Sequence, residues 1–436
     1  MSEPLKVALA GLGTVGVGVI RLVEANKALI ERRAGRPIVI TVVSARDRTR
    51  ARGVDLSPYA WEDDMVILGE RTDVDVVVEM VGGSDGPALA LARTTIEAGK
   101  ALVTANKAMI AHHGLELAAK AEAQKVALKF EAAVAGGIPV IKGLREGAAA
   151  NAIERVYGIL NGTCKYILTV MEDTGRDFAD VLAEAQAKGY AEADPAFDIE
   201  GIDAAHKLSI LAAISFGTRL DFASVATSGI TRLRAADIAQ ADALGYVIRL
   251  IGMADAGPAG LFQRVQPHLV PFDHPLAHVD GATNAVVAEG NFSGRLLFQG
   301  AGAGDGPTAS AVVADLIDIA RSALTGSEVA NAFSVPVSEL EAMPPAPTGH
   351  RLGRAYLRFM VKDRPGVLAE IAAALRDADV SIESLIQKGR AGDAGEVMVA
   401  LVTHEGPESA VNEAMHLLEG SESLSEAPLV LHILDA

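Results

Sequence analysis

A polar segment of the 436-residue chain, residues 189–207, gathers acidic side chains just ahead of a lysine. Five carboxylates fall within 12 residues, at Glu192, Asp194, Asp198, Glu200 and Asp203. Asp203 and Lys207 are four residues apart, so in a helix they share one face, which continues along apolar residues at 210, 211 and 214. This arrangement favours a site that captures an ammonium group or orients a lysine. The alternative is an ordinary ion pair, worth about 0.2–0.5 kcal/mol.

Two other residues have side chains that could react or donate a proton. Lys107 follows the apolar run 101–104, and ligands of open α/β sheets bind beyond the carboxyl ends of the strands. The pattern favours a functional lysine there; the alternative is a lysine that only begins a helix. Cys164 is the single cysteine and a candidate nucleophile, but the sequence shows no histidine paired with it. A buried structural thiol is the more common case.

Three glycines near the N-terminus have the spacing G-x-G-x-x-G, between an apolar run and a stretch with helical periodicity. In such a turn Gly11 permits the tight bend, Gly13 lets a pyrophosphate approach the backbone, and Gly16 lets the helix pack on the strand. The start of the helix offers unpaired N–H groups to the phosphates. The turn therefore predicts dinucleotide binding, and a purely structural turn is the alternative.

The end of the second predicted strand indicates which dinucleotide is preferred. NAD enzymes place an acidic residue there to bind the ribose hydroxyls. Here the sequence is Ser-Ala-Arg46-Asp47-Arg, with Arg50 and Arg52 following. An arginine can pair with a 2′-phosphate, so the pattern favours NADP(H), while Asp47 leaves NAD(H) open. The other interpretation is a solvated basic loop.

Strand-like and helical patterns alternate from residue 5 to about 136. Runs rich in Val and Ile at 38–45, 74–81, 101–106 and 126–134 predict strands, and Ala-rich segments at 87–100 and 114–125 predict helices. This alternation is typical of an α/β fold with a parallel sheet covered on both faces. Together with the glycine turn it predicts a Rossmann-type domain.

The rest of the chain divides at changes of pattern. Residues 137–305 mix strands and helices, which predicts an α+β domain; residues 334–353 carry four prolines and predict a linker. The order βαββαβ beyond them predicts a small ferredoxin-like domain. We therefore expect a dinucleotide-binding domain (1–136, completed by 306–333), a substrate-binding and catalytic domain (137–305), the linker, and a C-terminal domain (354–436).

Composition excludes several classes of protein. The net charge of −17 repels nucleic acid and anionic membranes, so neither is an expected partner. One cysteine allows no internal disulfide and no Cys-rich metal site. The sequence shows neither a signal peptide nor a run of roughly 20 apolar residues, so we expect a cytoplasmic protein.

Taken together, these segments resemble the homoserine dehydrogenases that carry a C-terminal ACT domain and no fused kinase. The resemblance covers nearly the whole chain, and residues 189–207 are its most specific part. The other segments that carry it are AGLGTVG (10–16), TANK (104–107), EAAVAGGIP (131–139), NGT (161–163), GAGAG (300–304), TASAVVADL (308–316) and DRPGVL (363–368).

The resemblance implies an NAD(P)-dependent oxidoreductase that interconverts L-aspartate 4-semialdehyde and L-homoserine, on the route to threonine and methionine. Lys207 would donate a proton to the carbonyl oxygen, with Asp203 and Lys107 beside it. This role suits the chemistry, because hydride transfer to an aldehyde builds an alkoxide that needs a positive, proton-bearing neighbour. Substrate contacts would come from Glu192, Asp198, Lys107 and Thr163. Cofactor contacts would come from Gly11, Gly13, Thr14, Val15, Gly16, Arg46, Thr104, Lys107 and Gly302.

The family also binds a monovalent cation, Na+ or K+. By resemblance the ligands would be the Glu131 carboxylate and the backbone carbonyls of Val134, Gly136 and Ile138. The ACT domain implies an amino-acid effector, for which we expect threonine, and the central domain implies a homodimer or homotetramer. Two other readings remain: an aldehyde dehydrogenase that forms a thioester at Cys164, and a non-catalytic dinucleotide sensor with an ACT domain.

Overall fold

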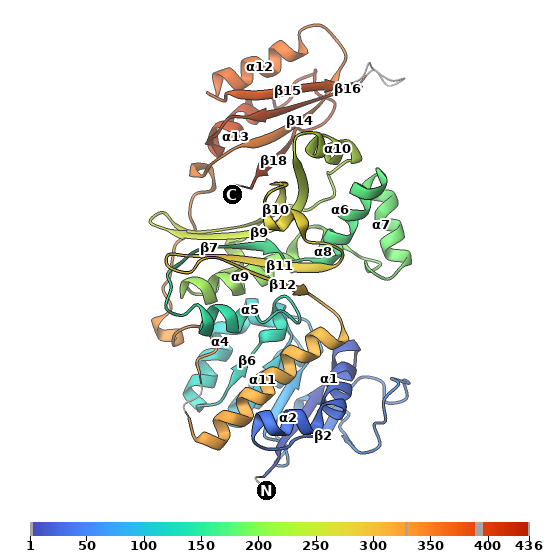
Figure 1. The fold of residues 1–436 in the computed structure, drawn as a ribbon, viewed down its shortest axis with the longest axis vertical. Coiled ribbons are helices and arrows are strands. Elements are labelled where there is room, and N and C mark those ends of the chain that lie inside the picture. Colours follow the sequence, from blue (N-terminus) through green and yellow to red (C-terminus); the bar gives the residue numbers. More distant parts are fainter. Residues whose placement is uncertain (1–2, 328–329, 389–395, 435–436) are drawn as a thin grey trace.

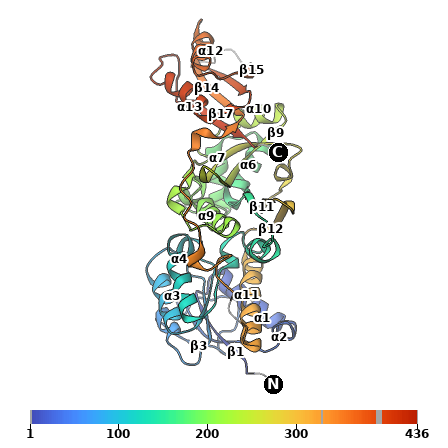
Figure 2. The same cartoon turned by 90° about the vertical axis from the view of Figure 1, so that its left-hand side faces the viewer.

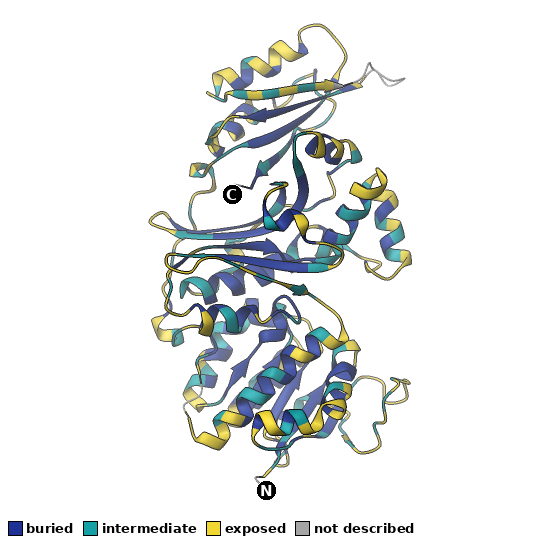
Figure 3. Cartoon of the chain, viewed as in Figure 1, coloured by how far each residue is buried: buried dark blue, intermediate teal, exposed yellow. Residues whose placement is uncertain are grey.

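The computed structural model describes residues 3–327, 330–388 and 396–434. The two larger sheets are stacked along the long axis of the molecule, with the N-terminal sheet at one end and residues 355–388 and 396–417 at the other, while the C-terminus lies near the middle (Figure 1). Buried residues follow the strands and the inner faces of the helices, while exposed residues line the outer faces (Figure 3). No helix of the described ranges has both the length and the apolar character needed to cross a membrane.

The N-terminal sheet is parallel throughout and has the strand order β3-β2-β1-β4-β5-β6. Its strands are β1 (Leu5–Ala10), β2 (Ile38–Ser44), β3 (Ala60–Trp61), β4 (Val76–Glu79), β5 (Ala101–Thr104) and β6 (Leu128–Lys129). Helices cover both faces, which is why the central strands are continuous apolar runs (Figure 2). One face carries α3 (Pro87–Glu97) and α4 (Lys107–Gln124), and the other α1 (Thr14–Ala25), α2 (Lys27–Ala34) and α11 (Asp305–Thr325). The predicted Rossmann-type sheet is confirmed.

Helix α11 comes from far along the chain and packs against α1 in the same hydrophobic core. The contact is close: a Cβ on Gly18 of α1 would lie 2.6 Å from the Asp305 carbonyl oxygen. The N-terminal sheet therefore uses residues on both sides of the central region.

The strand predicted at 126–134 is much shorter than expected. Only Leu128–Lys129 pairs with β5, after which the chain forms a 3₁₀ turn at Glu131–Ala133. Ala135 and Gly136 follow with φ of 56° each, a conformation that ends any strand. The β-branched and aromatic residues of this stretch are buried in the core without extending the sheet.

The central region forms one part of a mixed, ten-stranded sheet, and its strands are antiparallel except for β8, which pairs in parallel with β10. Its strands are β7 (Ile153–Ile159), β8 (Ala226–Thr227), β9 (Tyr246–Gly257), β10 (Gly260–Pro271), β11 (Thr283–Gly290) and β12 (Gly294–Ala301). Its helices are α5 (Val140–Lys142), α6 (Gly162–Thr174), α7 (Phe178–Ala187), α8 (Ala196–Ile199), α9 (Ile202–Phe216) and α10 (Ala235–Ala243). Helix α9 is buried along most of its length, between this sheet and α4 of the first domain. It thus lies where the two sheets face each other.

The C-terminal domain has the predicted βαββαβ order, and its fold class is confirmed. Its elements are β14 (Ala355–Lys362), α12 (Val367–Asp377), β15 (Ile382–Lys388), β16 (Glu396–Thr403), α13 (Glu408–Leu417) and β18 (Leu429–Ile433). The strand order is β18-β14-β16-β15. The outermost strand, β18, also pairs in parallel with β10, so the central and C-terminal sheets are continuous.

Buried charges reinforce this junction. The Arg264 guanidinium of β10 donates two hydrogen bonds to Glu408 of α13, at 2.7 and 2.8 Å. Arg358 of β14 pairs with Asp237 of α10, which also accepts a 3.1 Å hydrogen bond from the Tyr356 hydroxyl. Removing one partner of a buried ion pair leaves an uncompensated charge, so the C-terminal domain is built into the molecule rather than tethered to it.

Candidate active site

Asp203 lies between two lysines that come from different domains. Its Oδ2 accepts a 2.7 Å hydrogen bond from Lys207 Nζ, one helical turn further along α9. Its Oδ1 is 3.0 Å from the Nζ of Lys107, the first residue of α4. Asp203 and Lys207 are 4% and 9% exposed, so the pair predicted from the i,i+4 spacing is buried. The structure thus brings together the three residues that the sequence singled out for proton transfer.

The charges of this group are unequal, with one carboxylate for two ammonium groups. Burial alone would raise the pKa of Asp203, but the ammonium groups of Lys207 and Lys107 outweigh it and lower that pKa below its ordinary value. Asp203 is therefore ionised throughout the neutral range. Lys207 Nζ donates a second hydrogen bond, of 2.8 Å, to the carbonyl oxygen of Leu160. These two bonds fix the position of its amino group.

Asn161 connects Asp203 with the acidic segment. Its side-chain amide donates to Asp198 Oδ1 at 2.7 Å and to Asp203 Oδ2 at 2.8 Å. Its carbonyl oxygen caps α6 by accepting the Cys164 N–H. Thr163 Oγ1 donates to the other oxygen of Asp198 at 3.1 Å. The sequence analysis assigned no role to Asn161, although its place as a helix cap one residue before Gly162-Thr163 was a usable signal.

A second asparagine that the sequence analysis missed lies behind Lys207. Asn284 of β11 donates a 3.1 Å hydrogen bond to the Leu160 carbonyl, the same oxygen that accepts from Lys207. A Cβ at Gly302 would lie 2.1 Å from Asn284 Cγ, so only glycine permits this approach. Nothing in the sequence pairs residues 160, 284 and 302.

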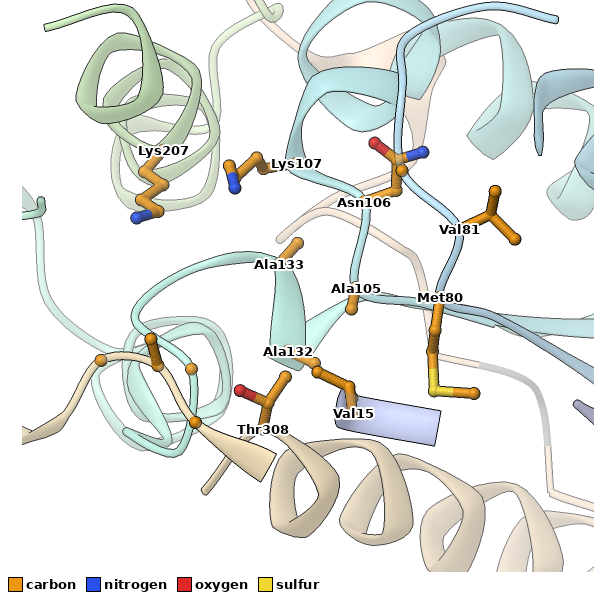
Figure 4. A pocket seen from close by; sticks show the side chains of 15 residues that line it. Val15, Met80, Val81, Ala105, Asn106, Lys107, Ala132, Ala133, Lys207 and Thr308 are labelled. Atoms are coloured by element: carbon orange, nitrogen blue, oxygen red, sulfur yellow. The ribbon is translucent and has the colours of Figure 1, made fainter. Parts of the chain in front are cut away.

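The lysines open onto a pocket of about 290 Å³ between the two domains. Lys107 and Lys207 project into one end of it, and Met80 and Val81 lie at the other (Figure 4). Its remaining lining residues are Val15, Gly82, Ala105, Asn106, Ala132, Ala133, Gly136, Gly302, Ala303, Gly304 and Thr308. A second pocket of about 520 Å³ shares Met80 and Val81 and extends past Gly11 and Gly13 to Arg46. Because the two pockets share these residues they adjoin each other, and together we call them the groove.

The glycine turn forms the middle of this groove. Gly11 has φ of +100°, and a Cβ there would lie 2.8 Å from the Met80 carbonyl oxygen. Gly13 borders open space and precedes α1, which begins at Thr14 without a side-chain cap. The first N–H groups of α1, including those of Val15 and Gly16, are therefore available to an anion in the groove.

Thr104 is placed differently from the other candidate cofactor residues. It is fully buried and donates a 2.6 Å hydrogen bond to Glu79 at the end of the neighbouring strand. Glu79 Oε1 in turn accepts the N–H groups of Val81 and Gly82, at 2.6 and 3.1 Å. This network shapes the loop at the floor of the groove.

The basic loop after β2 borders the far end of the groove. Asp47 Oδ1 accepts from the N–H and hydroxyl of Thr49 and from the Arg50 N–H. The hydrogen bonds from Thr49 lower the pKa of Asp47. Arg46 is exposed, lines the pocket, and makes no hydrogen bond or ion pair with the described residues. Asp47 is thus occupied by its own loop, while the Arg46 guanidinium is free.

Glu192 and Cys164 stand apart from the lysine group. Glu192 is exposed, and within the described ranges its carboxylate contacts neither Asp198 nor either lysine. Cys164 is fully buried, its thiol donates to the Asp198 carbonyl at 3.2 Å, and burial raises its pKa. A buried thiol with a raised pKa is a poor nucleophile.

The segment expected to hold a cation is a compact turn below Gly302. Glu131 is 3% exposed, and its two oxygens accept the N–H groups of Ile141 and Lys142 at 3.0 and 2.9 Å. Burial, with Asp315 nearby, raises the pKa of Glu131 to about 7. Across residues 3–327, 330–388 and 396–434, no three His, Cys, Asp or Glu side chains cluster as a metal site. A cation here would depend on backbone carbonyls beside this one carboxylate.

Three segments of the chain match the models of known protein families. Residues 139–317 match the model of the homoserine dehydrogenase family, residues 11–131 match the homoserine dehydrogenase NAD binding domain, and residues 355–419 match the ACT domain. The homoserine dehydrogenase of Pseudomonas aeruginosa is 46% identical over 97% of each chain. The chain belongs to the homoserine dehydrogenase family.

Solved structures of the family agree with this assignment. A homoserine dehydrogenase from Thiobacillus denitrificans superposes with a TM-score of 0.93 at 42% identity, over 99% of each chain. A hyperthermophilic archaeal homoserine dehydrogenase mutant in complex with NADPH matches 75% of this chain and all of its own, with a TM-score of 0.63 at 25% identity. The protein is therefore an oxidoreductase with an NAD-binding domain, a homoserine dehydrogenase catalytic region and an ACT domain.

Proposed function

We propose that this homoserine dehydrogenase interconverts L-aspartate 4-semialdehyde and L-homoserine at the lysine group, with Lys207 as the proton donor and acceptor. The observation that carries the proposal is the Asp203 carboxylate shared by Lys207 and Lys107 at the end of the groove. A bound nicotinamide supplies the hydride for the carbonyl carbon. Lys207 donates a proton to the carbonyl oxygen as the alkoxide forms, and Lys107 adds a second positive charge beside it. Asp203 holds both amino groups in place.

The polar ends of the substrate need partners of opposite charge. The ammonium group suits the acidic segment, where Asp198 is held by Asn161 and Thr163. The substrate's carboxylate would pair with Lys107 or Lys207 or accept hydrogen bonds from the N–H groups at the start of α6. Glu192 is exposed, so it would reach the substrate only if its side chain turned inward.

For the cofactor we propose NADP(H) as the preferred ligand and NAD(H) as an alternative. Gly11, Gly13, Thr14, Val15 and Gly16 would surround the pyrophosphate, with Gly302 and Lys107 near the nicotinamide and Thr104 supporting the floor. The free guanidinium of Arg46 and the internally bonded Asp47 favour a 2′-phosphate over ribose hydroxyls. The archaeal relative solved with NADPH supports this choice.

Replacing Arg46 by alanine should weaken NADPH binding roughly 10- to 100-fold, the effect of losing a hydrogen bond to a charged group. NADH has no 2′-phosphate, so its dissociation constant should hardly change. Fluorescence titration with both cofactors measures the two values. Arg32→Ala, on the exposed side of α2, is the control. Equal losses for NADPH and NADH would contradict the assignment.

We also propose that a monovalent cation, Na+ or K+, binds beside Glu131, with carbonyl oxygens from Val134, Gly136 and Ile138. The buried carboxylate fits a hard cation, because a positive charge would favour its ionised form. Such an ion would fix the turn that lines the pocket at Ala132, Ala133 and Gly136.

The alternatives to this function are less well supported. A thioester route needs a thiolate that substrate can reach, and Cys164 is buried with its thiol donating to a carbonyl. A dinucleotide sensor has no need of a lysine pair at the end of its groove. The deciding experiment is NADPH oxidation by the full chain with L-aspartate 4-semialdehyde; no turnover at any pH between 6 and 10 would rule the proposal out.

For regulation we propose that the enzyme serves threonine and methionine synthesis and that threonine inhibits it through the ACT domain. Gly366 precedes α12 with φ of 96° and open space around it, so a small ligand can approach the backbone there. Strand β18 of the ACT domain pairs with β10, so a change in the ACT domain on ligand binding could reach the catalytic sheet directly.

Three further properties remain predictions. They are assembly as a homodimer or homotetramer, the domain limits 1–136, 137–305 and 354–436, and a cytoplasmic location.

Gly366→Glu should abolish inhibition by millimolar threonine and leave the uninhibited rate nearly unchanged, because the carboxylate fills the effector space. Gly99→Glu is a matched control: Gly99 also has a positive φ and open surroundings, at the end of α3 in the first domain. It should keep the threonine response. Initial rates with and without threonine give the comparison. A wild-type enzyme that shows neither inhibition nor a thermal shift with threonine would refute the regulatory role.

A further inference from the structure

Arg52 connects two parts of the cofactor groove that are far apart in the sequence. Its Nε donates a 3.1 Å hydrogen bond to the carbonyl oxygen of Leu12, inside the glycine turn. Its two terminal nitrogens donate to the carbonyl oxygens of Arg50 and Asp47, in the basic loop after β2. The guanidinium carbon lies 5.8 Å from the centre of the Trp61 ring. One side chain thus bonds three backbone carbonyls from two loops.

The bond to Leu12 bears directly on the glycine turn. A trans peptide is planar, with its C=O and N–H pointing in opposite directions. Holding the Leu12 carbonyl towards Arg52 therefore turns the N–H of Gly13 the other way. Gly13 lines the groove and immediately precedes α1. The guanidinium thus sets the direction of a backbone donor at the position where the pyrophosphate is expected.

The bonds to Asp47 and Arg50 act on the neighbouring loop. They close the chain between these two residues into a fixed turn, which Asp47 Oδ1 also stabilises from within. Arg46 stands at the start of this turn, so its direction depends on the turn's shape. Arg52 has committed three of its five N–H groups to carbonyls, so turning the whole guanidinium fork towards a phosphate would break these bonds.

We propose that Arg52 is a positioning residue that holds the pyrophosphate turn and the arginine loop in one arrangement without itself binding a phosphate. The family to which the chain belongs establishes a dinucleotide-binding domain. The effect of Arg52 that acts through Arg46 rests on the NADP(H) preference proposed above. Positioning through Gly13 affects both cofactors, whereas positioning through Arg46 affects only NADP(H). Loss of Arg52 should therefore weaken the binding of both cofactors, and it should weaken the binding of NADP(H) more than that of NAD(H).

The test compares Arg52→Ala with wild type and with Arg48→Ala in the full chain, by fluorescence titration with NADPH and NADH. Arg48 is the matched control, because its guanidinium also lies over the Trp61 ring, at 5.6 Å, but makes no hydrogen bond with the described residues. Arg52→Ala should raise the dissociation constant of NADH roughly 3- to 10-fold and that of NADPH by more. Its kcat at saturating cofactor should stay within about 2-fold of wild type. Arg48→Ala should leave NADH binding unchanged.

Other outcomes would overturn the inference. A loss confined to NADPH would show that Arg52 does not act through Gly13, and unchanged affinities for both cofactors would mean that its three hydrogen bonds position nothing that the cofactor contacts. If Arg52→Ala does not fold, Arg52→Lys provides the measurement. Its single nitrogen cannot occupy the three positions from which Nε and the two terminal nitrogens reach these carbonyls, so NADH should still bind more weakly. Wild type that binds NADPH and NADH equally would defeat the NADP(H) preference but not the effect of Arg52 on NADH.

Discussion

Replacing Lys207 by alanine is expected to lower kcat for L-aspartate 4-semialdehyde by at least ~10²-fold, the usual scale for a lost general acid. The buried ammonium group is held by Asp203 and the Leu160 carbonyl, and a water molecule in its place would be a far weaker acid. NADPH binding should change little, because Lys207 only borders the end of the groove. Stopped-flow single turnovers and NADPH titration separate these two quantities.

Lys165→Ala serves as the control for loss of a buried lysine. Lys165 is 2% exposed and donates to Thr169 within α6, and it does not line the pocket. It should keep most of the turnover, so a fall specific to Lys207→Ala cannot come from burial alone. Substantial turnover by Lys207→Ala would remove this lysine from proton transfer.

Asp203→Asn should reduce kcat by a similar factor, again at least ~10²-fold, because two ammonium groups lose the carboxylate that they share. The amide has one acceptor oxygen and two donor hydrogens, so it cannot hold both lysines and also accept from Asn161. Lys207 and Lys107 would repel each other without a counter-charge between them. Steady-state kcat and KM over a range of pH give the measurement.

Asp194→Asn, in the same acidic segment, is the matched control for this change. Asp194 is exposed, and among the residues that the structure describes its carboxylate bonds only to the N–H of Ala196, two residues away. It should behave like wild type. An Asp203→Asn variant that raises KM but keeps its kcat would show that Asp203 binds substrate and does not position the lysines.

The fold was predictable where local pattern and burial agree. The Val-rich runs at 38–45 and 74–81 contain β2 and β4, because strands covered on both faces are built mostly of apolar residues. The prediction of a strand over 126–134 was wrong beyond Lys129, since the chain turns at Glu131–Ala133 and Ala135 and Gly136 adopt positive φ. An apolar run indicates which residues are buried. It does not show at which residue a strand stops pairing with its neighbour in the sheet.

The site was predictable where its geometry is local. The spacing of Asp203 and Lys207 places them on one face of α9 without any knowledge of the rest of the fold. By contrast, Asn284 meets the Leu160 carbonyl through contacts between residues more than a hundred positions apart. The sequence also could not distinguish Arg46 from Arg52. Both are arginines of the same loop, but in the fold Arg52 lies beside three backbone carbonyls while Arg46 lies in solvent.

The late arrival of α11 affects how the chain matures on the ribosome. The first domain cannot bury the inner face of α1 until α11 has been translated, roughly 15 to 60 s later at ordinary elongation rates. During that interval the residues around Gly18 present an uncovered apolar surface, because Asp305 and Ala309 of α11 are not yet beside them. The nascent N-terminal domain is therefore expected to need chaperones that bind emerging chains until α11 has been made.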